Sequence, residues 1–484
     1  MSAKVLVIGL DGLTLDVINP LLESGRLPNL SRLRAEGLAA SLHSTDPPTS
    51  APAWTSCRTG VNPGKHGLFS FWRVFNYEWV FRTSAEVQVP AVEHILSRQG
   101  RRVCTVNVPI TYPPQPVNGM VLSGLPMPGP ESNFTYPASL HAELLARVGD
   151  CPVDGFGAVD DATPVRLLQY LYSRHHRRRD IARYLLRRER WDYYMVVFTV
   201  SDKIQHAFWR ARERWLEGDT SELMQRFGPT IDHCYEMLDE TVGTLMADAG
   251  DDAMVLVISD HGFGPCENEV YPNVWLRESG YFRLRFAHKV WARQLRWRRR
   301  SSWPLLLPHL EIGPPCRRVA WGQTRAFGSL YVESRSVRLN LRGREPQGVV
   351  APGHEADKLL QELADGFWGL KMPDGRPMFD RVYRPEELYE GPFARQAADL
   401  ILKTSDPSTR ILGKFTVAHM FHPLTEVRAS TGNHRPLGIL FARGPGVHVQ
   451  ALPEVPHIMD VAPTVLRTLG EPVPAYMDGR PLFG

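Results

Sequence analysis

Short, continuously apolar segments alternate with longer segments of helical spacing in this 484-residue chain. Four of the apolar segments, residues 5–9, 103–108, 193–200 and 254–259, are rich in β-branched residues. Such segments are typical of strands that are buried on both faces of a parallel sheet. Residues 16–35 instead have the apolar spacing of a helix that is interrupted near Pro28. The alternation predicts an α/β fold, with a mainly parallel, doubly wound central sheet and helices on both faces.

The composition changes at about residue 270. Residues 270–427 are rich in aromatic residues, arginine and proline, and residues 326–341 have the pattern of a hairpin. The chain then returns to a strand-like segment at residues 437–441 and a helix-like segment at residues 460–469. We therefore expect residues 1–269 and 428–484 to form one core, and residues 270–427 to form an inserted cap.

The charge balance argues against a nucleic-acid or membrane partner. Lysine and arginine number 56 against 52 acidic residues, which leaves a net charge of only +4. Residues 174–190 are basic, but Ile181, Tyr184 and Leu185 share one helical stripe, which favours an amphipathic surface helix over nucleic-acid contact. The second basic tract, LRWRRR at residues 295–300, predicts either a solvated edge of the cap or a phosphate-binding or acid-binding surface.

Cysteine usage and the N-terminal sequence indicate where the protein resides. The six cysteines are scattered without short spacings, so neither a disulfide framework nor a cysteine zinc site is predicted. The N-terminus runs from MSAK directly into VLVIGLDG and lacks the pattern of a secretory signal. No apolar run approaches the ~18–20 residues that span a bilayer. These features predict a cytoplasmic protein without a membrane span.

Polar side chains with metal-binding chemistry lie at the ends of the predicted strands, where function collects in doubly wound sheets. Asp202 and His206 are four residues apart, so on a helix both face the same side. Taken alone, an aspartate after a strand is more commonly a helix cap or a turn residue. His206 alone is more commonly a partly buried histidine with satisfied hydrogen bonds, and Ser50 alone a loop residue. Together they offer oxygen and nitrogen ligands without a thiolate, which suits zinc or manganese. The full set is Asp11, Asp202, His206, Asp260, His261 and His434, with Ser50 in a proline-stiffened loop before a helix that we expect from about Thr55.

Seven motifs, in order along the chain, resemble the alkaline phosphatase superfamily, and specifically the type I phosphodiesterase/nucleotide pyrophosphatase family. They are LVIGLDG, PPTSAPAWTSCRTGVNPGKHG, NVPITYPP, SDKIQH, VISDHGFG, GNHRPLGILFARGPG and DVAPTVLRTLGEPVPAYMDGRPL. The resemblance implies an alkaline phosphatase-like catalytic core and two divalent metal ions, zinc in most members and manganese in some.

The resemblance also assigns roles to residues of this chain. One ion would be bound by Asp11, Asp260, His261 and the Ser50 hydroxyl, and the other by Asp202, His206 and His434. Ser50 stands where the family commonly has a threonine nucleophile, and Thr49 remains the alternative nucleophile. A divalent cation lowers the pKa of a bound hydroxyl, which agrees with a serine nucleophile that needs no separate base.

The predicted activity is metal-dependent hydrolysis of phosphodiester or nucleotide pyrophosphate bonds through a covalent phosphoserine. The substrate is then a small phosphate ester or a nucleotide-linked molecule. A phosphomonoesterase or phosphoglycerate-mutase-like phosphotransferase is the alternative on the same fold, and a nonenzymatic protein that binds anions or nucleic acid is a further one. Sulfatase activity is disfavoured, because sulfatases have arginine where this chain has Trp54.

Substrate contacts are predicted near the nucleophile and in the cap. Trp54 either stacks on the substrate or packs in the core. Arg58, Lys65 and Arg73 are candidate cations, with His66 close by, and each has an alternative role as a loop-stabilising or surface group. By analogy with related enzymes, the cap selects the substrate through arginines in or near its hairpin. These are Arg325, Arg335, Arg338, Arg342 and Arg344.

Overall fold

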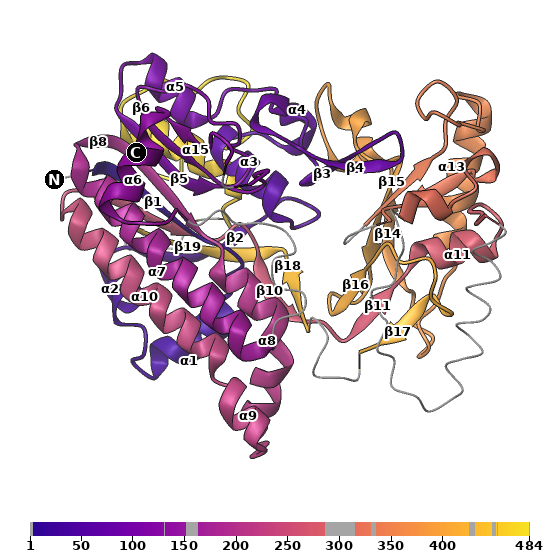
Figure 1. Ribbon diagram of the computed structural model, residues 1–484, viewed down its shortest axis with the longest axis horizontal. Helices are drawn as coiled ribbons and strands as arrows, with labels where there is room; N and C mark the ends of the chain where they lie inside the picture. Colours follow the sequence, from indigo (N-terminus) through magenta and orange to yellow (C-terminus); the bar gives the residue numbers. More distant parts are fainter. Residues whose placement is uncertain are drawn as a thin grey trace.

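An eight-stranded sheet forms the centre of the larger part of the molecule (Figure 1). The computed structural model describes residues 3–129, 131–151, 163–285, 315–330, 335–424, 431–447, 452 and 454–483. The strand order is β2-β19-β9-β1-β8-β5-β6-β7, and the five strands from β9 to β6 are parallel. The strands are β1 (Ala3–Leu10), β2 (Leu38–His43), β5 (Val103–Val108), β6 (Gly119–Ser123), β7 (Thr135–Tyr136), β8 (Trp191–Phe198), β9 (Met254–Ile258) and β19 (Leu437–Arg443).

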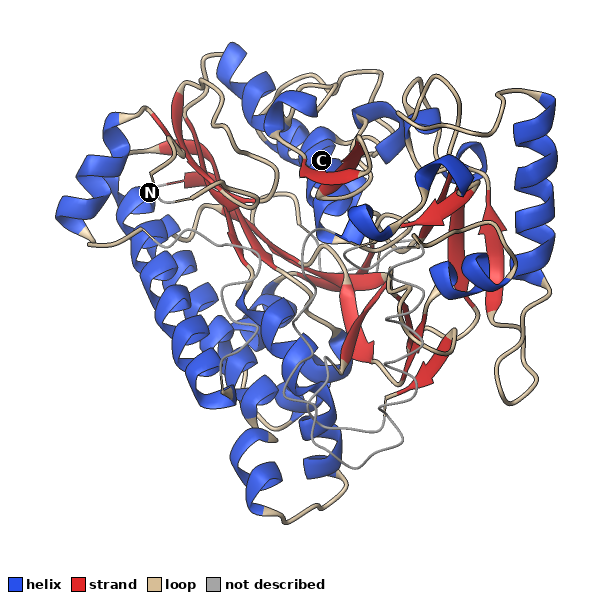
Figure 2. Ribbon diagram, turned by 45° about the vertical axis from the view of Figure 1, so that its right-hand side comes forward, coloured by secondary structure: helices blue, strands red, loops and turns tan. Residues whose placement is uncertain are grey.

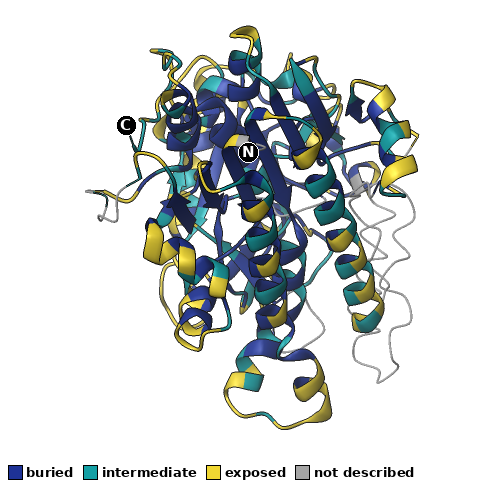
Figure 3. Ribbon diagram, turned by 90° about the vertical axis from the view of Figure 1, so that its left-hand side faces the viewer, coloured by how far each residue is buried: buried dark blue, intermediate teal, exposed yellow. Residues whose placement is uncertain are grey.

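Helices cover both faces of this sheet, and successive residues of each strand pack against opposite layers. On β1, Leu6 and Ile8 join one apolar core, whereas Val5 and Val7 join the other. The first core lies under α1 (Leu15–Glu23), α2 (Pro28–Glu36), α7 (Pro164–Arg188), α8 (Val200–Leu216) and α10 (Thr230–Ala249). The second lies under α3 (Ser50–Thr59), α5 (Val92–Arg98) and α15 (Val461–Thr468). Figure 3 shows the strands buried between helices whose exposed residues point outward. The predicted fold class is confirmed.

A second, smaller sheet of order β12-β13-β15-β14 has its own apolar core (Figure 2). Its strands are β12 (Ala326–Gly328), β13 (Ser336–Leu339), β14 (Phe379–Tyr383) and β15 (Leu400–Thr404), and β12 and β13 form the expected hairpin. Helices α11 (Pro272–Glu278) and α13 (His354–Trp368) pack on it. The hairpin of β3 (Trp72–Phe75) and β4 (Glu78–Phe81) also reaches this region, because Tyr77 at its tip stacks on Trp321 at 3.8 Å. None of the eight central strands comes from residues 270–427.

Most predicted elements are present, with small shifts at their ends. The helix expected from residues 16–35 is the pair α1 and α2, and Pro28 is the first residue of α2. The third predicted strand ends at Phe198, two residues earlier than expected, because α8 begins at Val200. The helix expected from about Thr55 begins at Ser50, since proline is tolerated in a first helical turn and Pro52 lies there.

The remaining expectations concern the surface and the cysteines. Basic residues 174–188 lie in α7, whose apolar stripe at Ile181 and Leu185 is buried against the sheet, as an amphipathic helix requires. All six cysteines are buried, and none forms a disulfide bond. Among the described helices none combines the length and apolarity that a bilayer crossing needs. Residues 295–300 lie outside the described residues.

Candidate active site

Two neighbouring parallel strands place two aspartates side by side. Gly9 of β1 pairs with Ile258 of β9, and Asp11 and Asp260 each follow two residues after these positions. The chain turns sharply after Asp11 at Gly12, whose φ of 76° lies in the left-handed region that favours glycine. The Gly12 N–H donates to Asp260 Oδ1 at 3.3 Å, so the turn also orients the second carboxylate.

The next strand, β8, leads into the helix that carries Asp202 and His206. Helix α8 begins two residues after β8, which puts Asp202 in its first turn. The expected helical spacing brings Asp202 Oδ1 to 3.4 Å from His206 Nε2. Asp202 is therefore held at the same edge of the sheet as Asp11 and Asp260.

A short antiparallel pair brings His434 to this edge. Strand β10 (Gly262–Pro265) pairs with β18 (Gly432–Arg435), and Phe263 lies opposite His434. The rings of His434 and His261 stack at a centroid distance of 3.7 Å. His434 Nε2 lies 3.1 Å from Asp202 Oδ1 and 3.0 Å from His206 Nε2.

Ser50 is the first residue of α3 and faces the same cluster. Its Oγ lies 3.4 Å from Asp11 Oδ1 and 3.2 Å from His261 Nε2. The helix is almost entirely buried and ends at Gly60, which has a φ of 69°. Thr49, the alternative nucleophile, caps this helix and lines a neighbouring pocket instead. The structure thus brings together all seven residues named from the sequence: Asp11, Ser50, Asp202, His206, Asp260, His261 and His434.

The three imidazoles turn their Nε2 atoms toward the cluster. Their Nδ1 atoms lie 2.9–3.0 Å from backbone carbonyls of Gly432, Gly262 and Pro48. A carbonyl oxygen only accepts hydrogen bonds, so each Nδ1 carries a proton, and the neutral form of each ring has its lone pair on Nε2. Burial, and after it the nearby His261, lowers the pKa of His434, which favours this neutral form. Metal-binding histidines are commonly oriented in this way.

Two of the three carboxylates, those of Asp11 and Asp260, face too little positive charge. Burial first, and then the charges of Asp260 and Asp202, raise the pKa of Asp11 well above its usual range. Burial and Asp202 raise the pKa of Asp260 to about 7. Burial acts in the same direction on Asp202, but His206 and His434 outweigh it and hold the pKa of that carboxyl well below its usual range. Asp260 Oδ2 is buried without a hydrogen-bond partner among the described residues.

These features fit divalent cations. Donor atoms of Asp11, Asp260 and His261 lie within 4.8 Å of one another, and so do those of Asp202, His261 and His434. His261 thus adjoins both groups, although the resemblance assigns it to one ion. Carboxylate oxygens and imidazole lone pairs in this arrangement suit zinc or manganese.

The four residues predicted to contact the substrate are engaged in contacts within the fold. Trp54 is fully buried against Gly9, and its indole N–H donates to Asp11 Oδ2 at 3.2 Å, so it orients a cluster residue. Arg58 is buried beside Glu93. Lys65 binds Asp478 and the Tyr476 carbonyl.

His66 is also buried, where its Nε2 lies 3.0 Å from Ser56 Oγ and its Nδ1 accepts from the Leu68 N–H. Burial lowers its pKa to about 3, so it is a neutral structural histidine. The structure therefore does not bring Trp54, Arg58, Lys65 or His66 to a substrate-contacting position, because each has its polar group engaged within the fold.

Several supporting residues were missed by sequence reasoning. The Ser201 hydroxyl donates to the Asp11 carbonyl at 2.6 Å, and Gln205 donates to the Gly12 carbonyl at 2.8 Å. Ser259 accepts from the Leu13 N–H and donates to the His261 carbonyl. Ser201 and Gln205 stand inside SDKIQH and Ser259 inside VISDHGFG, but nothing in these short motifs shows which polar residues point inward.

Comparisons with known proteins agree with this geometry. A family model described as type I phosphodiesterase/nucleotide pyrophosphatase matches residues 5–434. Phosphonoacetate hydrolase from Sinorhizobium meliloti has a similar structure, with 16% identity, a TM-score of 0.58, and coverage of 97% of this chain and 96% of that one. Human ectonucleotide pyrophosphatase/phosphodiesterase 5 is similar at 13% identity and a TM-score of 0.53, with coverage of 98% and 97%. No curated protein matches the sequence.

At such low identity the two structures show only that this chain shares their fold. The family match adds the class of reaction, because it spans nearly the whole chain and includes every motif from LVIGLDG to the histidine of GNHRP. It leaves the nonenzymatic alternative without support. The chain is therefore a phosphoric ester hydrolase, and it belongs to the type I phosphodiesterase/nucleotide pyrophosphatase family.

Proposed function

We propose that the protein hydrolyses phosphodiester or nucleotide pyrophosphate bonds with Ser50 as the nucleophile. The observation that carries this proposal is the convergence of the Ser50 hydroxyl, three carboxylates and three imidazole Nε2 atoms at one sheet edge. Asp11, Asp260, His261 and Ser50 would hold one divalent ion, and Asp202, His206 and His434 the other. Zinc is the proposed metal, with manganese as the alternative. Residues 270–427 are the proposed cap.

Bound divalent ions would supply positive charge that lowers the pKa of the Ser50 hydroxyl and neutralises phosphate oxygens. Ser50 Oγ then forms a bond to phosphorus while the bond to the leaving oxygen breaks, and water later cleaves the phosphoserine ester and restores the hydroxyl. The start of α3 lies at Ser50, so the positive end of the helix dipole faces the negative charge that develops there. Trp54 and Gly12 hold Asp11 and Asp260 in position through their N–H groups.

Metal analysis combined with an ester panel tests this function. The purified protein should contain about two divalent ions per chain, as a two-metal site requires. It should cleave aryl phosphodiesters and nucleotide pyrophosphates faster than aryl phosphomonoesters, and dialysis against a chelator should abolish both activities. A protein that keeps its activity without metal, or that cleaves none of these esters with zinc or manganese, would refute the proposal.

One observation supports a second candidate function, which is phosphomonoesterase or phosphotransferase activity. Monoesters carry an additional negative charge, which needs additional cations. Four arginines, Arg73, Arg82, Arg335 and Arg338, line a pocket beside Thr49. A preference for monoesters in the same panel would favour this candidate over the diesterase.

A further inference from the structure

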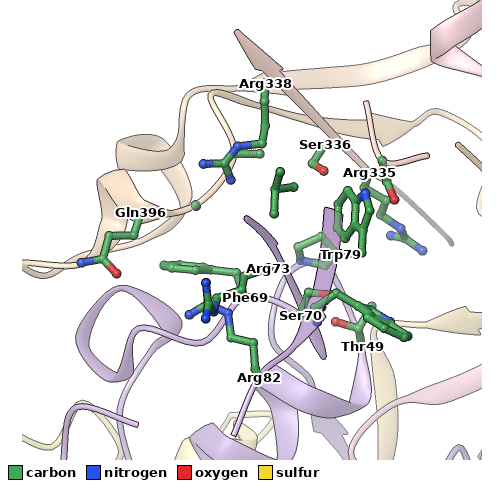
Figure 4. A pocket seen from close by; sticks show the side chains of 16 residues that line it. Thr49, Phe69, Ser70, Arg73, Trp79, Arg82, Arg335, Ser336, Arg338 and Gln396 are labelled. Atoms are coloured by element: carbon green, nitrogen blue, oxygen red, sulfur yellow. Dashed lines mark hydrogen bonds between the residues drawn. The ribbon is translucent and has the colours of Figure 1, made fainter. Parts of the chain in front are cut away.

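A pocket beside the proposed nucleophile is lined by arginine from both regions of the molecule. Figure 4 shows Arg335, Ser336 and Arg338 on its upper side and Thr49, Ser70 and Arg82 on its lower side. The upper residues belong to β13 or directly precede it, and the lower ones come from the central region. Arg73, Trp72 and Trp79 of the β3–β4 hairpin complete the wall between them.

The pocket and the acidic cluster share residues 47–50 as a common wall. Pro47 and Thr49 line the pocket. The Pro48 carbonyl accepts from His434 Nδ1, and Ser50 Oγ lies beside Asp11 and His261. The pocket therefore adjoins the segment that ends at Ser50.

Three arginines of the pocket, Arg73, Arg82 and Arg338, share the carboxylates that face them. None of its described lining residues is acidic. Arg73 and Arg82 share one carboxylate, that of Glu86, at 3.3 and 3.2 Å. Arg338 lies 4.0 Å from Glu345, which also binds Arg344 at 3.0 Å. Arg73 and Arg82 thus share one carboxylate, and Arg338 shares another with Arg344, which also pairs with Asp399.

Two of these arginines also have unmet hydrogen-bonding capacity. The Nε atoms of Arg82 and Arg338 are buried without a hydrogen-bond partner among the described residues. Burial lowers the pKa of both side chains, and the charges of Arg344 and Arg82 lower the pKa of Arg338 further. Buried cations with too little counter-charge are costly, and an anion that accepts hydrogen bonds from guanidinium groups offsets that cost.

Aromatic and hydrogen-bond contacts fix the walls of the pocket, and its volume limits what it can hold. Tyr77 at the hairpin tip stacks on Trp321 and donates to Asn340 Oδ1 at 2.8 Å, which ties the hairpin to the cap. Trp72 and Phe81 stack across the hairpin at 3.8 Å. The pocket volume is about 120 Å³, whereas sites for drug-sized ligands have about 300–1,000 Å³. It therefore suits a small oxyanion and not a nucleoside.

We propose that this arginine pocket binds a second anionic group of the substrate, a carboxylate or a phosphate, next to the ester that Ser50 attacks. This inference rests on the proposed function and narrows it to phosphate esters that carry a second small oxyanion. Arg338 and Arg82 supply the buried donors, and Arg73 and Arg335 complete the positive wall.

A matched set of substrates tests the pocket. p-Nitrophenyl phosphodiesters share one leaving group, and their second alcohol would carry a methyl ester, a free carboxylate or a phosphate. The wild-type enzyme should prefer the anionic substrates by at least about 10-fold in kcat/KM, and Arg338→Gln should lower kcat/KM for them by a similar factor. The methyl ester should change by less than about 2-fold. The carboxylate and phosphate arms show which oxyanion is preferred.

Controls separate charge from folding. Arg376→Gln removes the same charge from an exposed site outside the pocket, and should leave the preference intact. Arg335→Gln serves as a second pocket variant if Arg338→Gln unfolds in a thermal melt. Arg338→Lys should recover part of the preference, because it restores charge without the guanidinium fork. An enzyme that shows no preference for the anionic esters, or pocket variants that retain it, would overturn the proposal.

Direct binding separates this inference from the proposed function. If the wild type cleaves no ester, isothermal titration of inorganic phosphate into chelator-treated protein still tests the pocket. Binding that Arg338→Gln removes and Arg376→Gln retains would support an anion site without diesterase activity. A wild-type protein that fails to bind phosphate, or equal binding by the wild type and both variants, would refute it.

Discussion

The acidic cluster and the arginine pocket lie on opposite sides of residues 47–50 and carry opposite, incompletely balanced charges. In the cluster, burial and a neighbouring carboxylate raise the pKa of Asp260 to about 7. In the pocket, burial and neighbouring cations lower the pKa of Arg338. Both shifts have the sign expected when a charge is buried without enough counter-charge. Each site is therefore suited to a ligand of the opposite charge, a cation in the acidic cluster and an anion in the arginine pocket.

The two parts also differ in construction. The cluster residues follow strands of the central sheet, so backbone pairing sets their positions. The pocket instead depends on contacts between the β3–β4 hairpin and the second sheet. We therefore expect changes in the cluster to abolish chemistry, and changes in the pocket to alter the choice of substrate.

The largest expected effect comes from removing the nucleophile. Ser50→Ala should lower kcat by at least about 10³-fold, because no other described hydroxyl lies against both Asp11 and His261. Thr49→Val is the matched control and should keep kcat within about 3-fold, since Thr49 faces the pocket. Single-turnover assays with an aryl diester give both values. If Thr49→Val were the inactive variant, the assignment of the cluster as the reacting side would be wrong.

A paired buried arginine should behave unlike the pocket arginines. Arg58 and Glu93 form an ion pair in which both side chains are at most 5% exposed. Arg58→Gln leaves the Glu93 carboxylate buried without its partner, which should lower the free energy of unfolding by about 3–5 kcal/mol. Arg338→Gln removes an incompletely balanced charge and should cost far less.

Chemical denaturation of Arg58→Gln and Arg338→Gln at one pH compares their free energies of unfolding. The control is kcat, measured on the folded fraction of each variant. Equal losses of stability would mean that the pocket arginines are as well compensated as Arg58. In that case the contrast between the closely paired Arg58 and the partly paired Arg338 would not hold.

The pH dependence of the free energy of unfolding, measured on metal-free protein, tests whether Asp260 in the acidic cluster lacks counter-charge. Asp260 has a raised pKa of about 7 in the folded state, so between its unfolded value near 4 and pH 7 the folded protein binds more protons than the unfolded chain. Stability should fall as pH rises through this window, by at most about 1.4 kcal/mol per pH unit from this one group. Asp260→Asn removes that contribution.

The measurement is a series of urea titrations of chelator-treated protein from pH 4 to 8. The variant should show the flatter profile and should exceed the wild type in stability at pH 8. With zinc present the order should reverse, because the asparagine is a weaker ligand. A variant that is less stable than the wild type at pH 8 without metal would show that Asp260 is already balanced.

Local sequence patterns predict the acidic cluster well because its geometry follows from a few regular rules. Asp11 and Asp260 each follow a strand, and Asp202 and His206 share one helical turn, so local patterns place all four at strand ends. The pairing of β1 with β9, which makes Asp11 and Asp260 neighbours, is seen only in the structure. His434 is harder, because only the pairing of β10 with β18 brings it to His261.

The pocket lies beyond such rules. Arg82 becomes a pocket residue only because Tyr77 packs on Trp321, a contact across more than 240 positions of the chain. Arg58 and Trp54 likewise look like substrate contacts in the motif, although the fold buries both against residues that no local pattern links to them.

We expect the smallest effect from changing Lys65, and this variant tests how far the anion site extends. Lys65 follows the nucleophile in the same motif, but its ammonium binds Asp478 and the Tyr476 carbonyl at a partly exposed position. Such a pair contributes about 0–1 kcal/mol, so Lys65→Met should shift the unfolding free energy by no more than that. KM for the anionic diester should also stay within about 2-fold of the wild-type value, whereas Arg338→Gln should raise it. A large rise in KM for Lys65→Met would extend the anion site beyond the arginine pocket, and would mean that charge near the nucleophile, rather than the built pocket, selects the substrate.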